Sequence, residues 1–200
     1  MLFSTPLVQA LKAGRKTQTR RPIKDVFCGG NGNGTGRWSF IAASTERGRE
    51  IEYARVRPPC LPGDLIYVRE MWSAPWEYEH TKPSEIPPGE PIHYWADGNP
   101  EAGDWMRPRP SLFMPKWASR LWLRVTDVRV ERVQDITPDD AIAEGVFHGG
   151  RYSTEPGIPY PVATFAAQWR SIYGESWDRN DWVWRIAFER CAAPARENGR

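Results

Sequence analysis

The sequence predicts a mixed α+β fold, in which a small β-barrel carries a few short flanking helices and long loop insertions. Short segments rich in β-branched and aromatic residues recur along the 200-residue chain, and several alternate in polarity as strands do. Helical periodicity is confined to three segments. These are too few to supply the crossovers of a parallel βαβ sheet, so a small barrel is the favoured architecture.

Five segments are predicted as barrel strands, because each alternates or forms a short apolar run between turn signals. They are residues 16–21, 65–69, 121–125, 128–133 and 182–188, and residues 92–95 form one further short strand. A tight turn around Thr126-Asp127 is expected to join the third and fourth strands.

Three helices are predicted from their start and stop signals. The first begins near Ser4 or Thr5, has Pro6 in its first turn and ends at Gly14. The second begins with the Thr137-Pro138 pair and runs to Glu144, because Gly145 is a typical stop. The third is the apolar stripe from residue 162 to residue 173, which Gly174 ends.

Together these elements predict one domain over residues 1–190. Residues 25–60 are rich in glycine at their start and loop-like, and residues 73–118 hold many of the 19 prolines. Both are expected to be insertions, since long irregular stretches are uncommon within compact domains. Residues 191–200 are expected to form a disordered tail.

Composition limits the classes of function. The net charge is +2, so attraction to nucleic acid requires local patches. Three cysteines and three histidines are scattered without metal-ligand spacing, and we expect no metal or other cofactor. No apolar run approaches the roughly 20 residues of a membrane span, and the N-terminus lacks a signal-peptide pattern. The prediction is a soluble, cytoplasmic protein without a membrane partner.

The segment from Gly14 to Pro22 organises the rest of the chain. It holds Arg15, Lys16, Arg20 and Arg21 with no acid among them, and threonines stand between the cations. One interpretation is an exposed edge strand with a solvated basic face, which is the usual meaning of a charged run. The other is a pocket that attracts anions.

In three passages the chain resembles the ASCH domains, a branch of the PUA-like β-barrels associated with RNA. Gly14-Arg15-Lys16-Thr17-Gln18-Thr19-Arg20-Arg21 is similar to the family's Gly-x-Lys-Thr-x-Thr-x-Arg segment after the first helix. Residues 62–68 resemble its Gly-Asp turn into a barrel strand, and residues 135–144 resemble a segment that ends in an acid. The resemblance covers about half of the chain and is closest to longer members found in phages and prophages.

The resemblance implies an activity. Small bacterial relatives in this family are N4-acetylcytidine amidohydrolases that use a lysine, a threonine and a glutamate. Those roles fall here on Lys16, Thr19 and Glu144 as catalytic residues. The substrate, a modified nucleoside or RNA, is expected to contact Arg15, Thr17, Arg20, Arg21, Tyr67, Glu70 and Trp72.

The implied chemistry has one geometric difficulty. A partly desolvated lysine has a lowered pKa and can accept a proton from Thr19 or from water. Residues three apart on a regular strand, however, point to opposite faces. Convergence of Lys16 with Thr19 therefore requires a bulge or sharp twist between Thr17 and Arg20.

Two other functions fit the same sequence. The basic segment, together with several of the eleven tryptophans that stand near cations, fits a non-catalytic RNA-binding module or a nuclease. The proline-rich stretch fits a phage assembly factor that docks through it. Convergence of lysine, threonine and glutamate favours the hydrolase, whereas an open basic groove lined with tryptophan favours nucleic-acid binding.

Overall fold

The structure is a computed structural model that describes residues 1–23, 40–44, 52–56, 58–146 and 160–194, and for 40–44 and 52–56 it describes the backbone alone. Within it the chain forms two compact units. The first unit comprises Met1–Arg15, Leu65–Arg124 and Glu189–Arg200, and the second comprises Lys16–Asp64 and Val125–Phe188. The prediction of a single domain over residues 1–190 stays a prediction.

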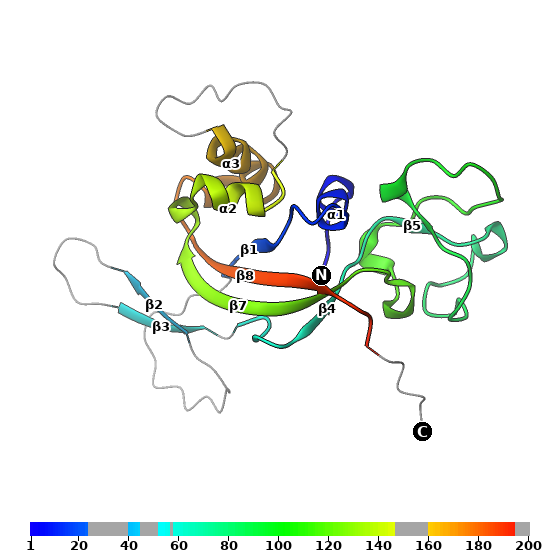
Figure 1. Ribbon diagram of the computed structural model, residues 1–200, viewed down its shortest axis with the longest axis horizontal. Helices are drawn as coiled ribbons and strands as arrows, with labels where there is room; N and C mark the ends of the chain where they lie inside the picture. The colour runs from blue at the N-terminus through cyan, green and yellow to red at the C-terminus, as the bar shows by residue number, and fades with distance from the viewer. Residues whose placement is uncertain (24–39, 45–51, 57, 147–159, 195–200) are drawn as a thin grey trace. The chain divides into compact units, whose positions relative to one another are not determined.

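The first unit begins with helix α1 (Thr5–Lys12), which lies where the sequence predicts it (Figure 1). Pro6 occupies its first turn, and its buried residues are Val8, Ala10 and Leu11. Gly14 has a φ of 72°, which an L side chain adopts only with strain, and so it ends the helix as expected.

Residues 73–118 contain a hydrophobic core of the first unit. Strands β5 (Trp72–Ser73) and β6 (His93–Tyr94) pair antiparallel there. Four short 3-10 helices, Trp76–Tyr78, Trp95–Asp97, Ser111–Phe113 and Lys116–Ala118, connect this region. Its buried side chains are Trp72, Ala74, Ile86, Met106, Met114 and Ala118. The stretch expected as a loop insertion therefore contributes packed structure, and the predicted strand at 92–95 is shorter than expected.

The second unit packs two helices over strands. Strand β1 (Gln18–Pro22) pairs antiparallel with β8 (Trp182–Cys191), in the part of β8 that belongs to this unit. Helices α2 (Pro138–Ala143) and α3 (Tyr160–Tyr173) supply an apolar core with the strands. The core residues are Val133, Ile136, Ala141, Val146, Val162, Phe165, Ala166, Trp169, Trp177 and Val183. The stripe predicted on the third helix is thus its core face from Val162 to Trp169, whereas Ile172 at its end is 65% exposed, and Gly174 ends the helix with a φ of 58°.

Residues Trp122–Arg132 form one continuous strand, β7. The prediction of two strands joined by a turn at Thr126-Asp127 is therefore wrong. Leu121, Leu123 and Val125 are buried at every second position, with Trp122 between them buried as well; the two exposed residues Thr126 and Asp127 follow, and burial resumes at Val128. The alternation therefore shifts by one residue, as it does at a β-bulge, and the strand continues. No glycine or proline is present there to reverse the chain, so the polar pair bends the strand without ending it.

A curled antiparallel sheet has the strand order β1-β8-β7-β4, where β4 is Leu65–Tyr67. Figure 1 shows β7 and β8 curving toward α2 within the second unit. The mixed α/β composition and the strongly curled sheet confirm the coarse fold prediction. Among the described strands, β1 and β4 are the two edges of this sheet, so it is half a barrel.

The remaining elements are short. Strands β2 (Phe40–Ser44) and β3 (Glu52–Val56) form an antiparallel pair within residues 25–60, which the sequence predicted as loop. The 3-10 helices Val133–Asp135 and Gly174–Ser176 follow β7 and α3. Strand β8 includes Cys191, which was expected in the tail, and residues 195–200 lie outside the described residues. No helix in the described part of the chain has the length and apolar character to span a membrane.

The start of α2 gives the first testable prediction. Thr137 accepts a hydrogen bond from the backbone N–H of Asp140, and the Asp140 side chain accepts one from the N–H of Thr137. Replacing Thr137 with alanine removes one half of this capping box, so the free energy of unfolding should fall by about 1 kcal/mol. Urea unfolding measures the loss. Thr137→Ser keeps the oxygen and serves as the control; an equal loss in both variants would contradict the capping role.

Candidate functional site

Strand β1 presents alternate side chains to the end of α2. Its register with β8 is unbroken from Gln18–Ala187 to Pro22–Val183, and the Thr17 carbonyl accepts the N–H of Phe188 at 2.9 Å in the same register. Because side chains alternate along an extended chain, Lys16, Gln18 and Arg20 lie on one face. Gln18 shows which face this is, since its Nε2 donates to the Asp140 carbonyl at 2.9 Å.

The end of α2 delivers Glu144 to that face. The helix starts at the Thr137 cap and stops at Glu144, because Gly145 has a φ of 87°. The N–H of Thr17 donates to the Ala143 carbonyl at 2.9 Å and so joins the beginning of β1 to the last turn of the helix. A helix only six residues long thereby receives a fixed position from tertiary contacts.

Lys16 and Glu144 meet across 128 residues of sequence. The Lys16 Nζ donates to Glu144 Oε2 at 3.0 Å, to the Glu144 carbonyl at 2.7 Å and to the Gln18 carbonyl at 2.8 Å. The lysine side chain is 1% exposed. Three acceptors match the three N–H donors of an ammonium group, so the buried charge is compensated in place.

Arg20 binds the other oxygen of the Glu144 carboxylate. Its Nη1 donates to Glu144 Oε1 at 3.1 Å, and its Nε donates to Glu131 Oε1 at 2.7 Å. Nη2 lies 3.2 Å from Asp140 Oδ2. The guanidinium is fully buried, which is tolerable because three carboxylates surround it. We call Lys16, Gln18, Arg20, Glu131, Asp140 and Glu144 the Lys16–Glu144 cluster.

The solvent side of the cluster is formed by Asp140 and Arg185. Arg185 lies 3.4 Å from Asp140 and 3.5 Å from Asp127, and its side chain is partly exposed. Asp140 also accepts a hydrogen bond from Gln18 Nε2 at 3.0 Å. The cluster therefore runs from a buried lysine–glutamate pair to a partly exposed pair, Asp140 and Arg185, at its solvent side.

Two side chains in the cluster have shifted pKa values. Burial lowers the pKa of Lys16 from its ordinary value, and the neighbouring Glu144 opposes that shift. Burial raises the pKa of Asp140, but the hydrogen bond from Gln18 and the charge of Arg20 outweigh it and bring the pKa to about 2. A buried lysine whose pKa is shifted by desolvation and by one specific charge partner is a candidate for a functional role.

The structure does not bring Thr19 to the cluster. Thr19 lies opposite Ile186 in an unbroken register, so its side chain points to the other face of β1 from Lys16, Gln18 and Arg20. The predicted bulge or twist between Thr17 and Arg20 is therefore wrong. Regular pairing with β8 persists because Thr17 and every residue of β1 find a partner in register.

The other residues expected to contact substrate have separate positions. Thr17 shares the face of Thr19, and Arg21 donates to the Tyr173 hydroxyl at 3.1 Å. Arg15 is exposed and belongs to the first unit, as do Tyr67, Glu70 and Trp72. Glu70 and Trp72 are buried in that unit.

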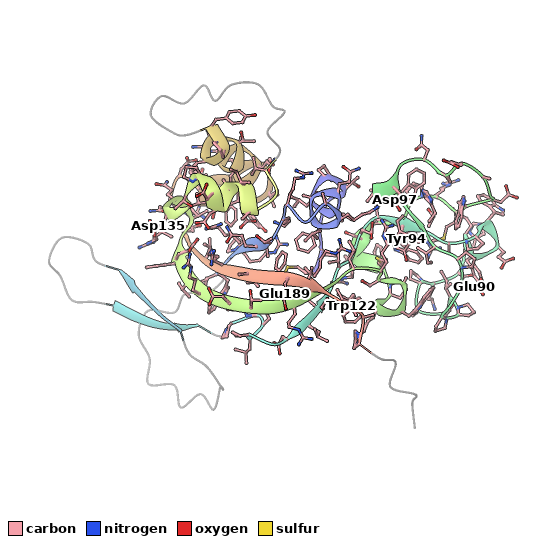
Figure 2. All side chains as sticks on the ribbon, in the orientation of Figure 1. Glu90, Tyr94, Asp97, Trp122, Asp135 and Glu189 are labelled. Atoms are coloured by element: carbon pink, nitrogen blue, oxygen red, sulfur yellow. The ribbon has the colours of Figure 1, made fainter. Side chains whose placement is uncertain are left out.

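Glu70 belongs to an ion network of its own in the first unit. Both of its oxygens accept hydrogen bonds of 2.9 Å from Arg120. Arg120 also pairs with Asp97 and lies 3.9 Å from the centre of the Tyr94 ring; Figure 2 labels Asp97 and Tyr94. This bidentate pair satisfies a fully buried carboxylate and fixes residues 94–97 to residue 70.

Sequence reasoning missed Gln18, Glu131 and Asp140. Gln18 and Asp140 carry usable signals, because Gln18 stands two residues from both Lys16 and Arg20, and Asp140 stands four residues before Glu144. Glu131 carries none, since only the course of β7 brings it to Arg20. Asp135, labelled in Figure 2, is the last residue of the 3-10 helix Val133–Asp135, which follows β7 and precedes α2.

Comparison with protein-family models, curated proteins and solved structures finds no match to this chain. Among the described residues no group of three or more histidine, cysteine, aspartate or glutamate side chains could hold a metal ion. The burial of Lys16 and Arg20 also removes two of the four cations through which the basic segment was expected to attract phosphates.

The two cations on Glu144 predict an asymmetry in stability. Glu144→Gln leaves both Lys16 and Arg20 without their shared charge and should lower the free energy of unfolding by about 3 kcal/mol. Lys16→Met leaves Glu144 paired with Arg20 and should cost at least about 1 kcal/mol less. Urea unfolding of both variants at neutral pH tests this. A larger loss for Lys16→Met would mean that the lysine, and not the glutamate, holds the cluster together.

Asp140 predicts a pH dependence. Its folded-state pKa of about 2 lies below the ordinary value of 3.8, so the unfolded state binds the proton first as the pH falls. The stabilisation is complete above about pH 4 and is lost toward pH 2. Because the carboxylate is partly solvated, it should amount to about 1 kcal/mol. The difference in unfolding free energy between wild type and Asp140→Asn should shrink over this window; a constant difference would contradict the assignment.

Proposed function

We propose that the protein is an ASCH-type hydrolase of PUA-like fold that removes an acyl group from a modified nucleoside such as N4-acetylcytidine. The observation that carries the proposal is the direct contact between Lys16 and Glu144, the lysine and glutamate positions of the amidohydrolase motif. They are far apart in sequence, and chain connectivity alone would not place them together. The curled sheet and short helices are compatible with a PUA-like barrel.

The chemistry requires a water nucleophile. Amide hydrolysis needs a base to take a proton as the acyl carbon is attacked, and an acid to protonate the departing nitrogen. Neutral Lys16 takes the proton from water as its oxygen bonds to the acyl carbon. The C–N bond then breaks, and the proton passes through Glu144 to the leaving amine. Thr19 has no part in these steps, because its side chain lies on the opposite face of β1.

Substrate access requires the last turn of α2 to move away from β1. The ammonium of Lys16 is enclosed by Glu144 and the Gln18 carbonyl. Displacement of the last turn of α2 from β1 breaks two of the three hydrogen bonds of Nζ and exposes the amine. Loss of the neighbouring carboxylate removes the interaction that opposes the lowered pKa of Lys16, and the neutral form is favoured as long as the bound substrate keeps water away from the amine.

Turnover of acylated nucleosides tests the proposal. Purified protein is incubated with N4-acetylcytidine and related acylated nucleosides, and the products are identified by mass. Lys16→Arg should abolish turnover, since arginine stays protonated, and Glu144→Gln should lower it about a hundredfold or more. Melting temperatures show whether each variant is folded.

The Thr19→Val variant distinguishes a water nucleophile from the Thr19 hydroxyl. Turnover should persist in this variant, since valine keeps the shape and β propensity of the buried threonine. Complete loss of turnover in folded Thr19→Val would restore threonine as the nucleophile. Full activity of Lys16→Arg would refute the proposed mechanism.

A further inference from the structure

One face of the paired strands in the first unit combines apolar and cationic side chains. The register sets Leu65 opposite Arg124 and Tyr67 opposite Trp122, so these four side chains share a face. The residues between them, such as Leu123, are buried on the other side. Trp122 is labelled in Figure 2.

Residues from two other segments extend this face. Leu2 forms a parallel bridge with Arg69, which places Leu2 beside the strand. The Arg69 guanidinium lies 5.7 Å from the centre of the Tyr67 ring, and its Nη1 donates to the Leu112 carbonyl at 2.9 Å. That hydrogen bond attaches the 3-10 helix Ser111–Phe113 to the same region. We call Leu2, Leu65, Tyr67, Arg69, Leu112, Phe113, Lys116, Trp122 and Arg124 the β4 face.

Four apolar side chains on the β4 face are partly exposed to solvent. Relative exposure lies between 38% and 55% for Leu2, Leu65, Leu112 and Phe113. A single exposed leucine is ordinary, but several gathered on connected elements are typical of an interaction surface. Three of the four are aliphatic.

The cations of the β4 face differ from the other cations of the first unit in their charge environment. Within the described part of the chain, Arg69, Lys116 and Arg124 have no carboxylate within ion-pair distance. Lys12, Lys82, Arg107 and Arg120 of the same unit are all paired with acids. Lys116 instead lies 5.5 Å from the centre of the Trp122 ring. The face thus carries uncompensated positive charge next to apolar surface.

We propose that the β4 face binds a protein segment rich in acidic and apolar residues. Its carboxylates would pair with Arg69, Lys116 and Arg124, and its apolar side chains would cover the exposed leucines and Phe113. Single-stranded nucleic acid fits less well. Bases stack on open aromatic rings, whereas Trp122 is only 7% exposed, a cation lies near each of the rings of Tyr67 and Trp122, and three of the four exposed apolar side chains are aliphatic. This proposal is independent of the hydrolase.

A random-peptide display selection on the immobilised full-length protein tests the proposal. Enriched peptides should combine Asp or Glu with Leu or Phe, and their binding is then measured by fluorescence anisotropy. Lys116→Glu combined with Arg124→Glu should weaken that binding about tenfold or more, because both charges reverse. Phe113→Ser should weaken it as well. Lys82→Glu reverses an exposed charge elsewhere in the same unit and should leave binding unchanged.

Three results would overturn the proposal. The first is a selection that yields no acidic, apolar consensus. The second is binding that survives the paired reversal in a protein whose melting temperature is unchanged. The third is tight binding of labelled single-stranded RNA, or of vesicles containing phosphatidylserine, that is lost in the same paired variant. That result would assign the face to a nucleic acid or to a membrane surface.

Discussion

The Glu144 carboxylate, held between Lys16 and Arg20, is the interaction on which the arrangement of the second unit depends. One carboxylate oxygen accepts from each cation, and all three side chains are buried. A buried charge is costly unless it is paired and hydrogen-bonded, and Glu144 is the partner that both cations share, so its loss leaves two buried cations without their common carboxylate. In the folded structure these contacts hold the last turn of α2, where Glu144 stands, against the face of β1 that presents the cations.

The same constraint explains features that would otherwise look unrelated. The capping box at Thr137 starts α2, and Gly145 stops it just after Glu144. The shift in the alternation of β7 near Asp127 lets the strand bend, and Glu131, farther along it, reaches Arg20. Each is a feature of the local backbone, and each helps to position a carboxylate of the Lys16–Glu144 cluster. Positioning by several short elements is typical of a site that the fold builds from distant segments.

The two units use charge in different ways. In the second unit most cations of the basic segment form buried ion pairs, with carboxylates that come from β7 and α2. In the first unit Arg120 likewise pairs with Glu70 and Asp97, but the cations of the β4 face have no carboxylate partner among the residues that the structure describes. A basic run in the sequence therefore says little about where positive potential reaches the surface. What decides it is whether each cation finds an acid on folding.

Local sequence signals predicted the helices and most of the strands. Capping residues, prolines and stop glycines act within a few residues, so α1, α2 and the end of α3 were predictable from local chemistry. The sequence also singled out Lys16 and Glu144 as residues expected to lie in one site, through a motif that resembles a known family. Tertiary structure alone decided that Thr126-Asp127 bends a strand instead of ending it, that residues 73–118 hold a core, and that Thr19 faces away from Lys16. The physical reason is the same in each case: strand pairing and the burial of charge depend on partners distant in sequence, and local propensity carries no record of them.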